Sequence, residues 1–162
     1  MNNSLWGNLF RSNNSWDKQV AKLWAQTPLF DDIPFNEITR LVRDMVPRSY
    51  VAGENIFRRG EQGAGAALIV EGQVEIRAGE VTLTQLNQGD FFGEVALVLD
   101  VPRTADAVAT ADTKLLFFLQ AGLDEWLARR PFYAGRLSKS LANILAQRLI
   151  MANAALAEKG GL

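Results

Sequence analysis

Apolar side chains recur at the spacing of a helix in the first part of the chain. They begin with Leu5, Trp6, Leu9 and Phe10, and resume after a polar break with Trp16, Val20, Leu23 and Trp24. The break, residues 12–15, is typical of a linker, and Ser15 is a candidate N-cap for the helix that follows. A second short helix is expected over residues 33–42, with Pro34 near its first turn, where a missing N–H costs nothing.

The middle of the chain has a different pattern. Between Val46 and Gln120, short runs of β-type residues alternate with turns marked by glycine. The clearest strands are residues 67–70, 74–77, 81–86 and 114–119. The second and third of these alternate apolar with polar side chains, as half-buried strands do. Short strands separated by regular turns predict a sandwich or barrel.

Helical spacing returns after Ala121 and continues to the end of the chain. A short helix is expected around residues 123–127, and a long one follows Pro131 and ends by Gly160. The fold class is therefore mainly β with flanking helices (α+β). The apolar stripe of the long helix fits packing on the β-domain, a cover over a site, or a dimer seam, and periodicity alone does not separate these.

Composition fits one globular domain and argues against several classes of function. The chain has 162 residues, and its 17 basic residues nearly balance 18 acidic ones, which gives no electrostatic reason to expect direct DNA binding. It contains no cysteine and no histidine. These are the usual ligands of zinc, iron–sulfur clusters and haem, and the usual members of nucleophile–base pairs. We expect no metal site and no enzymatic activity.

The first residues carry no targeting pattern. No basic region leads into an apolar stretch, and no apolar run approaches the roughly 18 residues that span a bilayer, so we expect a cytoplasmic protein. Residues 5–11 could form an amphipathic anchor for a membrane surface or a partner. With only Arg11, Lys18 and Lys22 as basic residues among the first 22, the attraction to anionic lipid would be weak, and packing on the protein's own domain is the simpler reading.

One segment, residues 89–105, differs from ordinary strand or turn. Gly93 permits an abrupt change of direction, and residues 94–97 have room for about one helical turn before Pro102. The free N–H groups of such a turn suit a phosphate, and Arg103 can add a cationic fork to the same anion. A carboxylate at Glu94 repels phosphate but accepts from a sugar hydroxyl. Donors for a phosphate beside an acceptor for a ribose indicate a nucleotide.

This segment carries a resemblance to a known family. Phe92-Gly93-Glu94-Val95-Ala96-Leu97, followed after four residues by Pro102-Arg103-Thr104-Ala105, closely resembles the phosphate-binding cassette of cyclic-nucleotide-binding domains such as those of protein kinase A regulatory subunits and catabolite activator protein. The resemblance extends from about Pro28 to Asn153. It implies a jelly-roll-like β-roll with N-terminal helices and a long C-terminal helix over the base. The expected domains are a helical extension, residues 1–27, and a cyclic-nucleotide-binding domain, residues 28–162.

The resemblance also implies roles for individual residues around one bound cAMP or cGMP. Glu94 would accept the ribose 2′-hydroxyl and Arg103 would pair with the cyclic phosphate. Thr104 stands where some members contact the phosphate or the amino group of a syn guanine, and Asn153, near the base, offers both a donor and an acceptor. The residues expected to form the site are Phe92, Gly93, Glu94, Val95, Ala96, Arg103, Thr104, Thr84 and Asn153, with the backbone N–H groups around Val95, Ala96 and Thr104 completing the phosphate cradle.

The chain departs from the family pattern before its third strand. Ala66 and Ala67 stand where many members have an aromatic pair, and Ala64 replaces a frequent acidic residue, so core packing there must differ. The bacterial activators continue into a helix-turn-helix, and we expect none in these 162 residues.

The leading interpretation is a non-enzymatic sensor that signals to an unknown effector protein through its C-terminal helix. Alternatives are a ligand-free interaction or scaffold module on the same fold, in which Glu94 and Arg103 could simply pair with each other, and the sensor part of a transcription regulator. A homodimer through the C-terminal helix is a further hypothesis.

Overall fold

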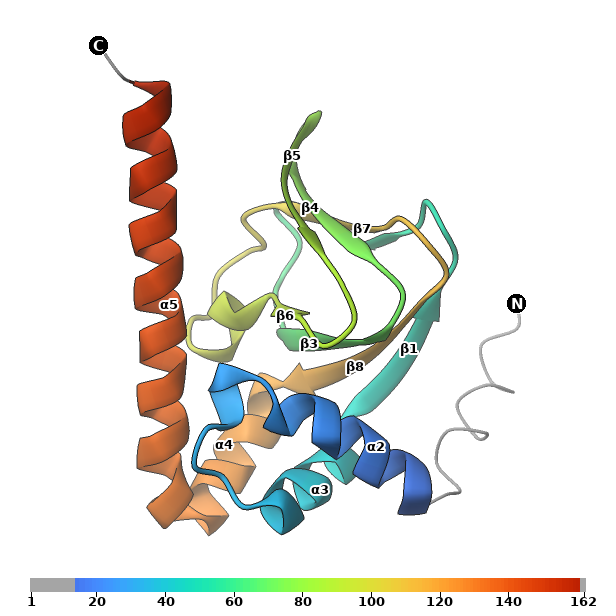
Figure 1. Cartoon of the computed structure of the whole chain (residues 1–162), viewed down its shortest axis with the longest axis vertical. Helices are drawn as coiled ribbons and strands as arrows, with labels where there is room; N and C mark the ends of the chain where they lie inside the picture. The colour runs from blue at the N-terminus through green and yellow to red at the C-terminus, as the bar shows by residue number, and fades with distance from the viewer. Residues whose placement is uncertain (1–13, 161–162) are drawn as a thin grey trace.

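The structure, a computed structural model, describes residues 14–160 and consists of a β-roll with helices at one end and along one side (Figure 1). Two four-stranded antiparallel sheets form the roll, in the strand orders β1-β8-β3-β6 and β2-β7-β4-β5. This arrangement confirms the predicted fold class. The strands are β1 Val46–Tyr50, β2 Asn55–Phe57, β3 Gly65–Glu71, β4 Val74–Ala78, β5 Val81–Leu86, β6 Phe91–Phe92, β7 Asp106–Ala109 and β8 Thr113–Leu119.

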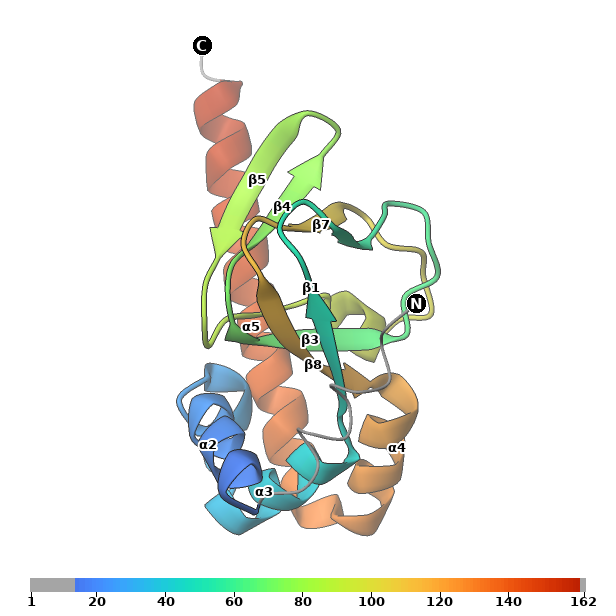
Figure 2. The same cartoon turned by 90° about the vertical axis from the view of Figure 1, so that its right-hand side faces the viewer.

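Short helices gather at one end of the roll, and the β4–β5 hairpin projects at the other end, beside the C-terminal half of the long helix (Figures 1 and 2). The first described helix, α2 Asn14–Ala25, begins one residue before Ser15, so the predicted N-cap lies inside the helix instead. The remaining helices are η1 Pro28–Phe30, α3 Phe35–Asp44, α4 Gln120–Arg129 and α5 Pro131–Lys159, and a single turn, η2 Glu94–Leu97, follows β6 on the side of the roll that faces α5 (Figure 1). The amphipathic segment at residues 5–11 lies outside the described residues.

Helix α3 begins two residues later than the range 33–42 that its pattern predicts, and ends two residues later, at Asp44. Pro34 has an extended backbone, with φ −61° and ψ 141°, and is the N-cap of α3, directly before the first turn near which the sequence predicts it. The side chains of α2 enter the same core as those of the roll: Trp24 is fully buried and contacts Phe30 and Phe91. The domain boundary at residue 28 stays a prediction.

Two adjacent alanines of β3 receive aromatic rings from neighbouring strands. Ala66 lies opposite Phe118 of β8, and Ala67 lies between Phe117 of β8 and Phe92 of β6. Both alanines are 1% exposed. The aromatic volume that the sequence lacks on β3 is thus supplied across the sheet, where directly opposed side chains are close enough to pack.

Strand β5 is exposed along most of its length, which differs from the half-buried strand that its alternation predicts. Val81 and Leu83 are 55% and 56% exposed. Among the described strands it pairs with β4 alone and so forms an edge of its sheet, and its apolar face lies over a cavity instead of against the second sheet.

The junction between α4 and α5 is tied to α3. Arg130, the single residue between the two helices, has its Nε 3.1 Å from Oε2 of Glu37, whose side chain is 7% exposed, while Arg40 contacts Oε1 at 2.8 Å. Pro131 then begins α5 at a position that needs no N–H partner. From this fixed point α5 runs 29 residues along the roll. Within residues 14–160, no helix combines the length and the apolar character needed to cross a bilayer.

Candidate functional site

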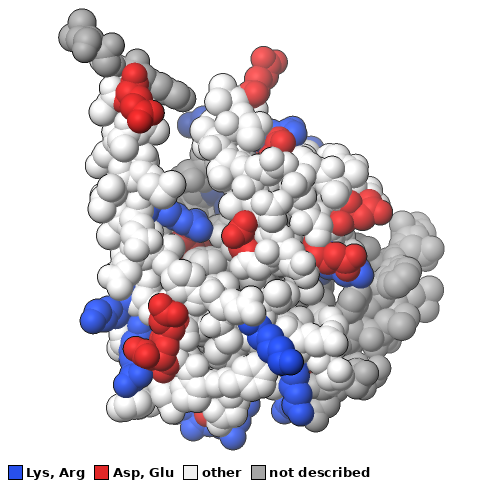
Figure 3. All heavy atoms as spheres, viewed as in Figure 1, with Lys and Arg blue, Asp and Glu red and all other residues white. Residues whose placement is uncertain are grey.

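A cavity of about 800 Å³ lies between the β-roll and α5. Figure 3 shows a hollow between the upper half of α5 and the roll, with basic and acidic atoms exposed inside it. Its walls come from β4 and β5, from the η2 turn, from residues 101–105 and from one face of α5. One end of the cavity is polar and the other is apolar.

The polar end is built on a sharp turn after β6. Gly93 has φ +76°, a left-handed conformation that favours glycine, and the η2 turn Glu94–Leu97 starts directly after it. This matches the change of direction and the single turn that the sequence predicts. The Ala96 N–H donates to the Gly93 carbonyl at 3.2 Å, so one donor expected to face an anion is already engaged within the turn.

Arg103 lies at this end with its guanidinium half-buried. Its Nη2 donates to the Gly65 carbonyl at 2.9 Å and its Nη1 to the Gly93 carbonyl at 3.2 Å, while its buried Nε has no hydrogen-bond partner within the described chain. Burial lowers the pKa of Arg103 from its ordinary value, and the nearby carboxylates of Glu94 and Glu61 oppose that shift. A desolvated cation with unused donors suits an anionic ligand.

Glu94 does not pair with Arg103. Its carboxylate is 2.5 Å from Nη1 of Arg148, which reaches it from α5, and the Glu94 side chain is only 7% exposed. The interpretation in which Glu94 and Arg103 merely fix the turn by pairing with each other therefore finds no support in the structure. Glu94 is instead the point at which α5 contacts the floor of the cavity.

The apolar end of the cavity faces the β4–β5 hairpin and α5. Its lining combines the exposed strand β5 with small and flexible side chains of the helix, namely Val81, Leu83, Thr84, Leu86, Met151, Ala152 and Ala155. A flat, largely apolar group such as a heterocyclic base fits such a lining, because most ligand sites are apolar with few polar groups.

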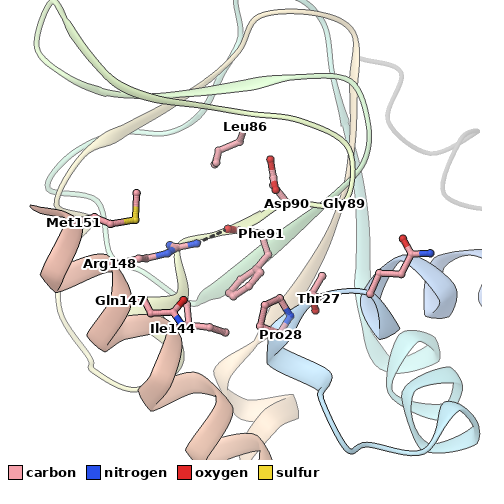
Figure 4. Close-up of a pocket in the computed structure, with 11 residues that line it drawn as sticks. Thr27, Pro28, Leu86, Gly89, Asp90, Phe91, Ile144, Gln147, Arg148 and Met151 are labelled. Carbon is pink, nitrogen blue, oxygen red and sulfur yellow. Dashed lines mark hydrogen bonds between the residues drawn. The ribbon is translucent and has the colours of Figure 1, made fainter.

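Arg148 also borders a second, smaller hollow of about 330 Å³. Figure 4 shows its guanidinium extending from α5 towards Phe91, with Thr27 and Pro28 on the opposite side of the hollow. Nη2 donates to the Phe91 carbonyl at 3.0 Å, and Cζ lies 5.3 Å from the centre of the Phe91 ring. Arg148 therefore separates the two hollows and joins α5 to both β6 and η2.

The structure brings most of the predicted site residues to the main cavity. Its lining includes Phe92, Gly93, Glu94, Val95, Ala96, Arg103, Thr104 and Thr84. Asn153 is not among the lining residues, because α5 turns Ala152 and Ala155 towards the cavity and Asn153 towards another face. The roles of these residues in binding stay predictions.

Among the cavity residues that sequence reasoning missed, Arg148 and Phe57 contact the two predicted charged residues. Arg148 shares a helix face with Ala152 and Ala155, and this three- and four-residue spacing was a usable signal. Phe57 lies with its ring 4.1 Å from Cζ of Arg103. Nothing in the spacing of β2 identifies this contact, since the two residues are far apart in sequence.

The family model, the curated relatives and the solved structures that match this chain all point to the same family. A family model described as cyclic nucleotide-binding domain matches residues 47–130, which is more than half of the chain. A cAMP-dependent protein kinase regulatory subunit of Mycosarcoma maydis is 32% identical over 109 residues, covering 65% of this chain and 21% of the relative. A CRP-like cAMP-activated global transcriptional regulator of Mycobacterium tuberculosis is 29% identical over 144 residues, covering 86% of this chain and 62% of the relative.

Solved structures agree with this match. The catabolite activator protein of Thermus thermophilus superposes with a TM-score of 0.73 at 30% identity, covering 83% of this chain and 63% of that one. A cyclic nucleotide-binding domain from Methylobacillus flagellatus superposes with a TM-score of 0.78 at 20% identity, covering 90% and 85%, and shows the fold alone. The chain spans less than two thirds of the length of the two curated relatives named above.

Proposed function

The chain belongs to the cyclic nucleotide-binding domain family, and from this we propose that it is a sensor that binds cAMP or cGMP and signals by rearranging α5. The observation that carries the proposal is the half-buried guanidinium of Arg103, whose described contacts are backbone carbonyls and one aromatic ring. A cyclic phosphate would supply the missing negative charge. Charge-assisted hydrogen bonds to such an anion are about twice as strong as neutral ones.

Glu94 addresses a different part of the ligand. Its carboxylate would accept the ribose 2′-hydroxyl, while Arg103, nine residues later, holds the phosphate. The base would then extend towards Thr84 and the apolar lining of β5 and α5. Thr104 lines the cavity on the phosphate side and can donate to the phosphate or to a guanine amino group.

The signal would pass through Arg148. Because Arg148 contacts Glu94 at 2.5 Å, a hydroxyl that bonds to Glu94 changes the environment of the residue that attaches α5 to the site. Ligand binding then shifts α5 only by as much as the ligand prefers one position of the helix over the other. We include in this proposal a contact of Asn153 with the base. Because Asn153 does not line the cavity of its own chain, the contact requires either that α5 turns or that Asn153 reaches the cavity of a second chain.

Isothermal titration with cAMP and with cGMP tests the proposal. We expect Arg103→Ala to weaken binding by about 100-fold or more, because it leaves a buried phosphate without its main cationic partner. Glu94→Ala should weaken binding less, since it removes one hydroxyl contact and spares the phosphate. Arg48→Ala is the matched control, because Arg48 is an arginine on β1 outside the cavity lining.

The proposal fails if Arg103→Ala binds as tightly as the wild type. If neither nucleotide binds the wild type or raises its melting temperature, the chain is the ligand-free interaction module that the sequence leaves as an alternative.

A further inference from the structure

No carboxylate makes an ion-pair contact with the guanidinium of Arg103 in the described chain, although Glu94 and Glu61 lie near enough to act on its charge. Two backbone carbonyls, those of Gly65 and Gly93, accept from its Nη atoms, and the ring of Phe57 stands 4.1 Å from its Cζ. No ion pair involves Arg103 among residues 14–160. Something other than a salt bridge must therefore fix the plane of this side chain.

Glycine backbone leaves the room that the guanidinium occupies. A Cβ at Gly93 would be 2.7 Å from Nη1 of Arg103, too close for either atom to stay in place, whereas one at Gly63 would make an ordinary contact of 3.5 Å with its Cζ. Gly93 therefore allows a close approach between its backbone and the guanidinium, but an absent side chain cannot hold a neighbour in place. The aromatic ring is the side-chain contact that can.

Phe57 is itself held by packing. It lies on β2, is partly buried, and its ring centre is 5.8 Å from that of Phe92 on β6. A ring face attracts a cation within about 6 Å, and the attraction grows when the cation is desolvated. Arg103 is partly desolvated, because its Nε is buried and has no hydrogen-bond partner among the described residues.

We infer that Phe57 is a positioning residue for the ligand: its ring face replaces a counter-ion and holds Arg103 in the plane set by the Gly65 and Gly93 carbonyls. The guanidinium is then already oriented when an anion enters, which lowers the entropic cost of binding. The part of this inference that concerns a ligand rests on the proposed function, whereas the contact between ring and guanidinium does not.

Two measurements on the full chain test the inference. In titrations with cAMP, Phe57→Leu should bind about tenfold more weakly, because leucine keeps apolar volume but has no ring face, and Phe57→Tyr should stay within about threefold of the wild type. Phe117→Leu is the matched control: Phe117 packs on the same small core cluster, on β8, and does not line the cavity. Thermal melting of each variant identifies any that fails to fold.

The second measurement needs no ligand. The side-chain Nε–H resonance of Arg103, assigned by its loss in Arg103→Lys, should show a ring-current shift in the wild type and in Phe57→Tyr. The shift should disappear in Phe57→Leu and persist in Phe117→Leu. If Phe57 only packed in the core, loss of its ring would not selectively remove the ring-current shift of Arg103 in Phe57→Leu while Phe117→Leu keeps it.

The outcomes separate the two proposals. If the wild type binds no cyclic nucleotide, the proposed function fails and the resonance alone decides the role of Phe57. The inference is overturned if Phe57→Leu keeps the shifted resonance, if it keeps wild-type affinity, or if Phe117→Leu loses as much affinity as Phe57→Leu.

Discussion

At the scale of single residues, the cavity depends on a glycine as much as on its charged groups. Gly93 combines two constraints, a left-handed φ of +76° and a guanidinium nitrogen 2.7 Å from the place of a Cβ. Any side chain there strains the backbone and also displaces Arg103. The two effects can be separated, because another glycine of the chain has only the first.

We expect Gly93→Ala to lower both stability and affinity for cAMP. The left-handed backbone costs about 1–2 kcal/mol for alanine, and displacement of Nη1 should weaken binding by about tenfold. Gly79→Ala is the control, since Gly79 has φ +61° and nothing within 4 Å of its Cβ position. Urea denaturation should show a similar loss of stability in both variants, and titration a loss of affinity in Gly93→Ala alone. Equal affinities would mean that the guanidinium can move aside without consequence.

The site residues that sequence reasoning found lie close together in the sequence, whereas those that it missed lie far from the residues they contact. Gly93, Glu94 and Arg103 fall within eleven consecutive residues, so their spacing alone brought them together. The residues that contact Glu94 and Arg103 lie outside this short segment. Arg148 reaches Glu94 from another element, and Phe57 reaches Arg103 from β2, and such contacts depend on how the roll and α5 pack.

At the scale of elements, α5 has two halves with different surroundings. Leu137, Leu141 and Ile144 are buried in the core, whereas every side chain from residue 146 to residue 158 is exposed. A helical segment of this length without packing is marginally stable in water. Arg148, through its contacts with Glu94 and Phe91, is the polar attachment of this half to the roll.

Removing that attachment should loosen the exposed half of α5. We expect Arg148→Ala to increase amide hydrogen exchange across residues 146–158 several-fold, because local opening no longer breaks two polar contacts. Arg136→Ala on the same helix is the control: it removes an arginine that contacts Asp32, and it leaves the attachment at Glu94 intact. Exchange that rises equally in both variants would show that Arg148 does not restrain the helix.

The elements themselves were largely predictable, and the exceptions have a physical reason. Strands 67–70, 74–77, 81–86 and 114–119 and the long helix after Pro131 all appear near the predicted bounds, because period and turn residues are local signals. The alternation of β5 predicted burial on one face. In the structure that face lies over the cavity, and no local pattern distinguishes a cavity wall from a packed core.

At the scale of the whole molecule, the exposed half of α5 carries apolar side chains that the described chain does not cover. Leu149, Ile150 and Leu156 are 61%, 67% and 68% exposed. Leu149 and Leu156 are seven residues apart, which is the repeat of helices that pair side by side. In a dimer related by a two-fold axis, the exposed apolar surface of α5 in each copy can cover that of the other copy.

We therefore predict a homodimer through α5, measured by light scattering during size-exclusion chromatography with and without cAMP. Replacing Leu149 and Leu156 together by glutamate should yield a monomer at a concentration where the wild type is dimeric, since two charges would be buried on each helix. Phe132→Glu is the control, because Phe132 is 71% exposed on the same helix but lies at its opposite end. A wild type that stays monomeric under both conditions contradicts the prediction. In that case α5 acts within one chain, and Asn153 can reach the base only if its own helix turns.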